Sequence, residues 1–127
     1  MSTEPFAIKD EGVAHPIAGS WRSIFQEVVK AFAKGDFELS RGVPGVEPVD
    51  TDIASQNREY VREYGEVLVE LPETTWGTSC AHWMGSYWEV LIDLYTENEG
   101  YSDLVLTGRM SEQNGKPQLT VGLIYVP

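Results

Sequence analysis

Two residue types that carry out chemistry in many enzymes, cysteine and histidine, occur two positions apart as Cys80 and His82 in the stretch TSCAHWMGSYWEVLIDLYT. On a β-strand this spacing directs both side chains to the same face, about 7 Å apart. A zinc site usually needs three or four protein ligands, and the other histidine, His15, lies in an irregular N-terminal segment. A nucleophilic cysteine needs a nearby base and a positive environment, whereas the neighbouring residues are acidic. We therefore expect Cys80 to be a small buried residue, His82 to be half-buried, and no metal to be bound.

Paired carboxylates on adjacent strands are another arrangement that supports acid–base catalysis, and Asp93 and Asp103 are the candidates. Carboxylates as abundant as these come to lie in pairs by chance. Apart from His82, the strand region offers no His or Lys that could act with them. The loop YTENEGYSDL invites comparison with a calcium-binding EF-hand. With Gly100 at its sixth position, Tyr95 and Leu106 would fall where carboxylate ligands are required. The sequence thus predicts no catalytic residue, cofactor or metal ion.

The N-terminal half of the chain predicts two helices after an extended lead-in. Residues 1–19 contain prolines and glycines without a clear period, so we expect an extended segment that lies over the domain. In SWRSIFQEVVKAFAKGDF, residues 20–37, large apolar side chains recur at helical spacing, with Ser20 as the expected N-cap. A second helix is expected to begin near Asp50 and to stop at Gly65. Its inward stripe is Ile53, Asn57, Tyr60, Val61 and Tyr64.

The apolar spacing then changes from helical to alternating, which predicts strands. We expect four of them, in EVLVELP (66–72), YWEVLIDLY (87–95), SDLVLTGRM (102–110) and QLTVGLIYV (118–126). The dipeptide Asn114-Gly115 between the last two is a strong signal for a two-residue β-hairpin turn. The sequence therefore predicts a single α+β domain over residues 1–127, with two N-terminal helices packed on a roughly four-stranded antiparallel meander.

The predicted strands have two faces of different character. Along residues 88–95 one face is apolar, whereas on the other Glu89 and Asp93 alternate with Leu91 and Tyr95. Further apolar residues expected on this second face are Leu68, Val105 and Ile124. A sheet face that mixes apolar and acidic side chains is typical of a surface that meets another protein or a second copy of the same chain.

The charge of the chain narrows the choice of partners. Twenty acidic residues against nine basic ones give a formal net charge of −11, and no Lys or Arg lies between Arg62 and Arg109. Such a field repels nucleic acid and anionic membrane lipid and favours a cationic partner. The N-terminal residues lack a secretory signal pattern, and a single cysteine cannot form an intrachain disulfide. We therefore expect a cytoplasmic protein.

The segment TTWGTSCAHWMGSYWEVLIDLYTENEGYSDLVL, residues 74–106, together with the terminal LIYVP resembles a small uncharacterised bacterial family, a domain of unknown function. The family pattern is a Trp, then S-x-A-x-W-M-G, then W-x-V-L-[VI]-D-L-x-T-x-E-E-G-x-S-D-L; Asn98 stands where it has an acid. The resemblance implies a bacterial origin and an α+β fold, and supplies no catalytic residue. We interpret its recurring Gly100 and Ser102 as residues that fix a turn.

We interpret the protein as a non-catalytic module that docks a basic protein through its acidic, aromatic-bearing sheet face. Immunity proteins that neutralise bacterial toxins are similar in charge and size, and the analogy goes no further. One alternative is a small-molecule-binding or enzymatic pocket between helices and sheet, in which His82, Asp93 and Asp103 converge with Trp88. The other is a homodimer formed through the mixed face. The candidate partner-binding residues are Trp83, Tyr87, Glu89, Asp93, Tyr95, Glu97, Glu99 and Asp103.

Overall fold

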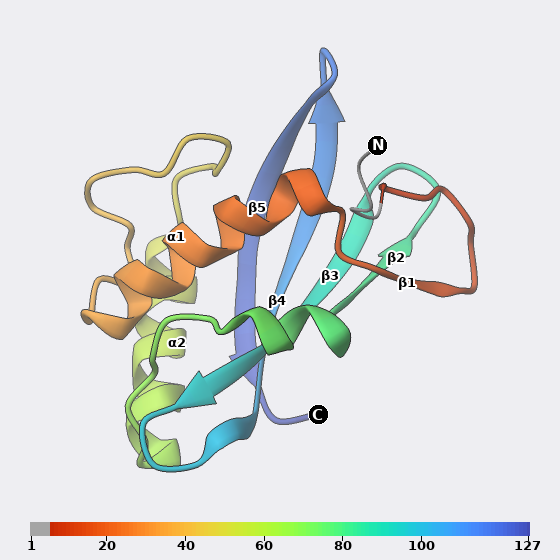
Figure 1. Cartoon of the computed structure of the whole chain (residues 1–127). Helices are drawn as coiled ribbons and strands as arrows, with labels where there is room; N and C mark the ends of the chain where they lie inside the picture. Colours follow the sequence, from red (N-terminus) through yellow and green to blue (C-terminus); the bar gives the residue numbers. More distant parts are fainter. Residues whose placement is uncertain (1–5) are drawn as a thin grey trace.

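The computed structural model describes residues 6–127, which form two α-helices and one five-stranded antiparallel sheet in the order β1-β2-β3-β4-β5 (Figure 1). The first five residues of the predicted lead-in lie outside the described residues. The strands are β1 (Ala14–Pro16), β2 (Cys80–Trp83), β3 (Trp88–Thr96), β4 (Gly100–Gln113) and β5 (Lys116–Tyr125). The helices are α1 (Arg22–Ala33), α2 (Thr51–Tyr64) and the short 3-10 helices η1 (Gly19–Trp21) and η2 (Glu73–Gly77). The predicted fold class, an α+β meander, is confirmed.

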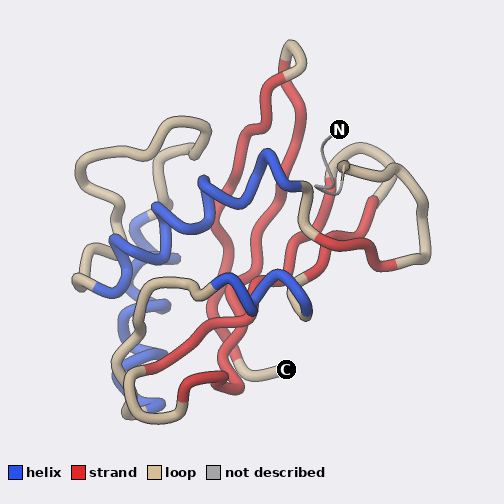
Figure 2. The backbone as a smooth tube through the Cα atoms, viewed as in Figure 1, coloured by secondary structure: helices blue, strands red, loops and turns tan. Residues whose placement is uncertain are grey.

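Helix α1 covers one face of the sheet because its apolar side chains recur on one side. Phe25, Val28, Val29 and Phe32 are all buried, at spacings of three and four residues. They join one core with the inward residues of β3, and Figure 2 shows α1 and η2 crossing the same side of the strands. Ser20 was predicted as the N-cap, and this is wrong: it lies within η1, so the turn of 3-10 helix takes the place of a side-chain cap.

Helix α2 begins and ends where its sequence signals predict. The Asp50 carboxylate accepts hydrogen bonds from the backbone amides of Asp52 at 2.8 Å and Ile53 at 3.2 Å, so two of the helix's free amide groups are satisfied. Gly65 ends the helix with a left-handed backbone, φ 86°. Of the predicted stripe, Asn57 and Val61 are buried.

Two tight turns set the register of the last three strands. Asn114 and Gly115 have φ values of 54° and 75° and join β4 to β5, as the dipeptide predicts. Between β3 and β4, Gly100 has φ 71°, a left-handed conformation that favours glycine. The Ser102 hydroxyl donates to the carbonyl of Leu94 at 2.7 Å, across the irregularity in the β3–β4 pairing. The interpretation of Gly100 and Ser102 as turn-fixing residues agrees with this geometry.

One strand assignment from the sequence and the faces assigned to two residues are corrected. Residues 66–72 form an irregular extended segment with a single bridge, from Leu68 to Thr96, and the sheet gains β1 and β2 instead. Leu68, predicted on the mixed face, is 3% exposed and belongs to the core, whereas Val67 is 54% exposed. Ile124, predicted on the mixed face, is buried in the core, because a register shift between Leu106 and Gly108 changes the side to which it points.

The outer edge of β5 is closed in two ways: residues 45–47 pair with Leu119 through backbone hydrogen bonds, and side chains of α2 close the part nearer the C-terminus. The fully buried Asn57 of α2 donates from Nδ2 to the carbonyl of Gly122 at 3.0 Å and accepts from the amide of Ile124 at 2.7 Å. The hydroxyl of Tyr60, one turn further along α2, accepts from the amide of Val126. One side-chain amide therefore replaces the donor and the acceptor that a neighbouring strand would supply.

The edge of β3 beyond the end of β2 is closed in a similar way. The Asp93 amide donates to the hydroxyl of Ser79 at 3.0 Å, and its carbonyl accepts from the hydroxyl of Thr75 at 2.7 Å. Both hydroxyl-bearing residues are buried, and their oxygens lie 3.0 Å apart. Further along, the amide of Val69 donates to the carbonyl of Tyr95 in β3, and the carbonyl of Val67 accepts from the amide of Glu97 just after β3. Side chains and loops thus satisfy backbone groups that a longer β2 would otherwise pair with.

Replacing Asn57 with Ala should lower the free energy of unfolding by about 3 kcal/mol, because the carbonyl of Gly122 and the amide of Ile124 lose their partner inside the protein. Urea denaturation followed by far-UV circular dichroism measures the change. The neighbouring exposed Gln56 provides the control, and Gln56→Ala should stay within about 0.5 kcal/mol of the wild type. Equal losses in the two variants would show that the edge closure contributes nothing.

Candidate functional site

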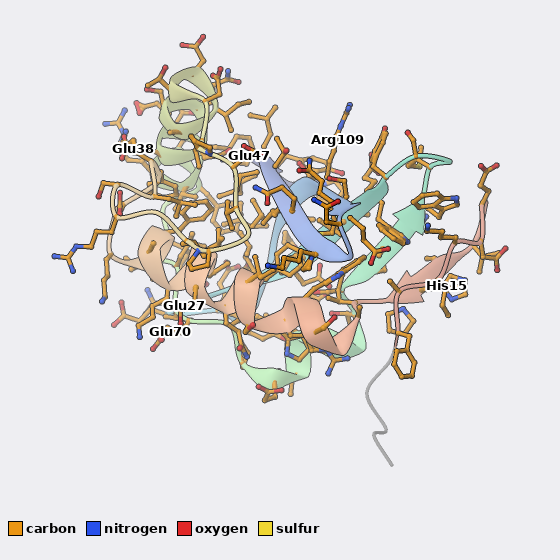
Figure 3. The ribbon with its side chains drawn as sticks, turned by 90° about the horizontal axis from the view of Figure 1, so that it is seen from above. His15, Glu27, Glu38, Glu47, Glu70 and Arg109 are labelled. Atoms are coloured by element: carbon orange, nitrogen blue, oxygen red, sulfur yellow. The ribbon has the colours of Figure 1, made fainter. Side chains whose placement is uncertain are left out.

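The sheet face opposite α1 carries three of the acidic residues predicted to bind a partner, Glu89, Asp93 and Asp103. Alternate residues of β3 and β4 point to this side, and Figure 3 shows Arg109 on the side of the sheet away from Glu27 of α1. We call this surface the open face. Its central residues are Glu89, Leu91, Asp93 and Tyr95 of β3 and Asp103, Val105, Thr107 and Arg109 of β4.

The register between β3 and β4 places unlike residues opposite each other. Glu89 lies opposite Arg109, Leu91 opposite Thr107, and Asp93 opposite Val105. Arg109 was not among the predicted site residues, and extending the alternation of β4 by two residues beyond Thr107 would have found it. Its guanidinium carbon lies 4.7 Å from the ring centroid of Tyr87, a cation–π contact that holds the ring at the rim of the open face.

The acids of the open face outnumber its bases. Three carboxylates, those of Glu89, Asp93 and Asp103, lie there with Arg109. The ion pairs found within residues 6–127 use the carboxylates of other residues, namely Asp10, Glu38 and Glu59. The open-face carboxylates are therefore available to a cationic group from outside the molecule.

The candidate Tyr95 belongs to an aromatic pair, and the candidate Asp103 lies beside this pair. The rings of Tyr95 and Tyr101 meet edge to face with centroids 5.6 Å apart, and Tyr101 is 54% exposed. The Tyr95 hydroxyl accepts a hydrogen bond from Thr74 at 3.2 Å, which fixes its ring. A hollow of about 360 Å³ lies beside this pair, lined by Asp93, Asp103, Tyr101, Val105 and the C-terminal residues Val126 and Pro127.

The candidates Glu97 and Glu99 lie in the turn between β3 and β4, away from the centre of the open face. Glu99 accepts a hydrogen bond from the Tyr64 hydroxyl at 2.7 Å, so it ties α2 to the turn. This bond to a carboxylate is the main cause that raises the pKa of Tyr64, because it favours the protonated phenol. Glu97 is exposed, and its amide donates to the carbonyl of Val67. Glu99 thus has a structural partner already.

Trp83 lies on the opposite side of the sheet from Glu89 and Asp93. It pairs with Trp88 across β2 and β3, the ring centroids of the two are 4.6 Å apart, and Trp88 is fully within the core. The structure therefore does not bring Trp83 together with the acidic candidates. The reason is the alternation of strand side chains: Trp83 shares the face of its register partner, which points toward α1.

Cys80 and His82 share one face of β2, as their spacing predicts. The Sγ of Cys80 lies 3.7 Å from Nε2 of His82, and both residues are partly buried. Burial raises the pKa of the Cys80 thiol, and the negative charges of Asp93 and Glu89 raise it further. In residues 6–127 there is no group of three or more His, Cys, Asp or Glu side chains placed to hold a metal ion.

The alternative of a pocket between helices and sheet is not supported by where its residues lie. Trp88 is 2% exposed and packs edge to face against Trp21, with ring centroids 5.0 Å apart. Asp93 and His82 point to the other face of the sheet, so they do not converge with Trp88. The layer between α1 and the sheet is filled by the apolar core.

The open face has a second hollow on its β5 side. A space of about 580 Å³ lies where α2 begins beside the sheet, between Glu89 and Arg109 on one side and Pro48 and Ile53 on the other. Thr107, Thr120 and Gly122 line it as well. The lining of this hollow therefore combines the carboxylate of Glu89, the guanidinium of Arg109 and the apolar side chain of Ile53. Such a lining suits a protruding side chain of another protein.

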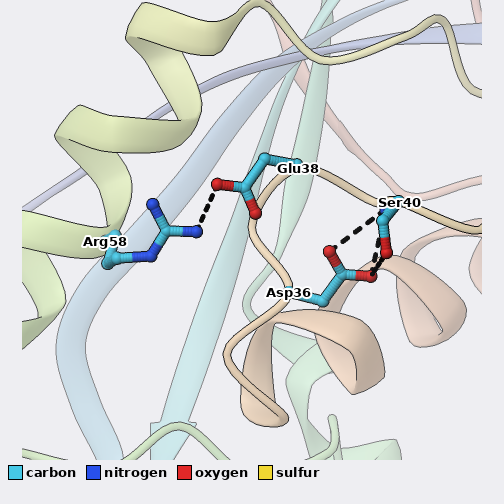
Figure 4. A network of polar contacts seen from close by, with 4 residues as sticks. All are labelled: Asp36, Glu38, Ser40 and Arg58. Carbon is cyan, nitrogen blue, oxygen red and sulfur yellow. Dashed lines mark hydrogen bonds and ion pairs between the residues drawn. The ribbon is translucent and has the colours of Figure 1, made fainter.

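A hollow of about 630 Å³ at the C-terminal end of α1 has a different character. It is lined by three bases, Lys30, Lys34 and Arg41, and three acids, Glu27, Asp36 and Glu38. Figure 4 shows that two of these acids have internal partners: Asp36 accepts from Ser40, and Glu38 pairs with Arg58. This pairing with Arg58 also lowers the pKa of Glu38. We assign the polar network a role in holding the loop after α1.

A comparison with protein-family models matched residues 29–127 to a domain of unknown function, DUF7668. The chain belongs to this family. The resemblance found in the sequence is thereby confirmed, and the DUF7668 match includes α2 and strands β2 to β5, with every residue of the open face. Comparisons with curated proteins and with solved structures gave no match. Within residues 6–127, no helix is long and apolar enough to cross a membrane.

The raised pKa of Cys80 in this DUF7668 domain has a measurable consequence. Because less of the thiol is ionised near neutral pH, alkylation by iodoacetamide should reach half its limiting rate at a higher pH in the folded protein than in urea. Asp93→Asn removes one of the causes and should move this midpoint to lower pH. Glu63→Gln, on the exposed side of α2, is the control and should leave it unchanged. A midpoint that does not respond to Asp93→Asn would contradict the assigned cause.

Proposed function

We propose that the protein is a non-catalytic, cytoplasmic bacterial binding module whose open face docks a basic protein. The observation that carries the proposal is the open face itself, a sheet surface left uncovered by α1. On β3 the acids Glu89 and Asp93 alternate with Leu91 and Tyr95, and β4 adds Asp103. Apolar side chains supply the area that a partner buries, and the carboxylates select a partner of positive charge.

The charge distribution supports a cationic partner at long range as well as at contact. The net charge of −11 and the absence of Lys and Arg from residues 63–108 give the open face a negative field. Fields of this kind speed the encounter with a basic protein and disfavour nucleic acid and anionic membranes. Arg109 opposite Glu89 gives the surface one positive point, which orients a partner that carries an acid among its bases.

The two hollows along the open face suit anchoring side chains of the partner. The space beside Glu89 and Ile53 has room and chemistry for an arginine, whose guanidinium reaches the carboxylate while its methylene groups contact the apolar wall. The exposed Tyr101 ring offers a second contact near Asp93 and Asp103. In charge and size the protein resembles immunity proteins of bacterial toxins, which is an analogy alone.

Reversing two open-face charges should abolish the interaction. A tagged Glu89→Lys/Asp93→Lys protein and the wild type are used for affinity capture from an extract of the source cells, followed by mass spectrometry. The matched control is Glu63→Lys/Glu112→Lys, which makes the same change of net charge at exposed positions of α2 and the β4–β5 hairpin. We expect a basic protein to be retained by the wild type and the control and lost from the open-face variant.

The experiment has two outcomes that contradict the proposal. If the wild type and both variants retain the same proteins, the open face is not the docking surface. If the wild type retains a second copy of its own chain and no basic protein, the open face is a homodimer contact instead. Size-exclusion chromatography with light scattering on the purified protein distinguishes this second case.

A further inference from the structure

The chain's own N-terminal residues occupy an aromatic site at the rim of the sheet. We call residues 6–12 the N-terminal flap. The indole Nε1 of Trp88 donates a hydrogen bond to the carbonyl of Ile8 at 3.0 Å. The ammonium of Lys9 lies 5.1 Å from the ring centroid of Trp83 and 5.8 Å from that of Trp88. Glu11 then forms a parallel bridge with Trp83 at the end of β2.

These contacts are those by which a domain recognises an extended peptide. The hydrogen bond uses a backbone carbonyl, the bridge uses the backbone of β2, and the one side chain that is specifically recognised is a lysine. Two indole rings beside one ammonium form a cation–π site, which is stronger for Trp than for other aromatic residues. Among the ion pairs of residues 6–127 none involves Lys9, so the rings are the charged group's principal contact.

The N-terminal flap is a weakly held cover over a preformed site. All its residues are exposed, with Phe6 at 75% and Ile8 at 44%, so its burial contributes little free energy. Gly12, with φ 83°, makes the turn that joins the flap to β1. Beneath the flap, Trp83 and Trp88 are positioned by the core and by Trp21, independently of Lys9. The flap can therefore leave without a loss of the ring arrangement.

The two tryptophans of the site lie inside the range matched by the family model. The match begins at residue 29. The N-terminal flap lies outside the matched range. Strand β1 and Trp21, which packs on Trp88, lie outside the matched range as well.

We propose that Trp83 and Trp88 form a binding site for an extended, lysine-bearing segment of another protein, and that the N-terminal flap occupies this site as an intramolecular competitor. The incoming segment places its lysine over the two rings and a preceding carbonyl on the Trp88 indole, as Ile8 and Lys9 do. The site lies on the other side of the sheet from the open face. The proposal for this site does not depend on whether the open face docks a partner.

The test measures binding of a synthetic peptide with the sequence of residues 6–14, FAIKDEGVA, to full-length protein by isothermal titration calorimetry. Lys9→Gln removes the competing ammonium, so this variant should bind the peptide about fivefold more tightly than the wild type. Lys34→Gln, at an exposed lysine beyond the end of α1, is the control and should match the wild type. A peptide with norleucine in place of lysine keeps the methylene chain without the charge, and should bind Lys9→Gln about fivefold more weakly.

Nuclear magnetic resonance of the indole N–H groups locates the binding. In the Lys9→Gln protein, the Trp88 indole resonance should shift on addition of the lysine peptide, because its Nε1–H takes a new carbonyl partner. The proposal is overturned if Lys9→Gln shows no binding at about 1 mM peptide, a concentration that detects affinities as weak as millimolar. It is equally overturned if the lysine and norleucine peptides bind alike, or if Lys9→Gln and Lys34→Gln gain affinity equally.

Discussion

The hydrogen-bonding groups at the sheet edges are the constraint on which the rest of this structure depends. A strand edge left unpaired recruits other strands, and a buried backbone group without a partner is costly. Here the amide of Asn57 closes the C-terminal part of β5, while the hydroxyls of Thr75 and Ser79 close β3 at Asp93. Each closing side chain sits on or next to a helix, α2 or η2. The hydrogen bonds that close a sheet edge therefore also attach a helix to the sheet.

Closed edges determine what kind of contact remains for a partner. Strand addition along the outer edge of β5 would have to displace residues 45–47, Asn57 and Tyr60. At Asp93 it would have to displace two buried hydroxyls. The partner that we propose for the open face would therefore contact side chains rather than backbone, and charge on those side chains would select it. The rim at Trp83 is different, because there the N-terminal flap already shows a backbone-mediated contact.

The parts of the fold that the sequence predicts correctly are those governed by local chemistry. Asp50 as a cap, Gly65 as a stop and Asn114-Gly115 as a turn each act within a few residues. The faces of β3 were also predicted, because alternation is a local property. Segment 66–72 was assigned wrongly because its pairing depends on Thr96, which is distant in sequence.

The candidate site was predicted only in part, for the same reason. Glu89 and Asp93 follow from the alternation of one strand, and the structure places them together on the open face. The position of Arg109 opposite Glu89 depends on the β3–β4 register, and that of Trp83 on its pairing with Trp88. Asn57 lay in the predicted helical stripe, yet its role at the edge of β5 requires knowing which strand lies beside α2. Contacts between distant segments carry no signal in a single sequence.

Footprinting of carboxyl groups tests the central claim, that a basic protein covers the open face, most directly. The tagged protein is labelled with a carbodiimide and an amine in cell extract, at about 50 mM and at about 500 mM salt, where exposed charge interactions are screened. Our account predicts that Glu89, Asp93 and Asp103 are protected at low salt and become labelled at high salt, while Glu63 and Glu112 are labelled equally in both. Equal labelling of the open-face carboxylates at the two salt concentrations would contradict it.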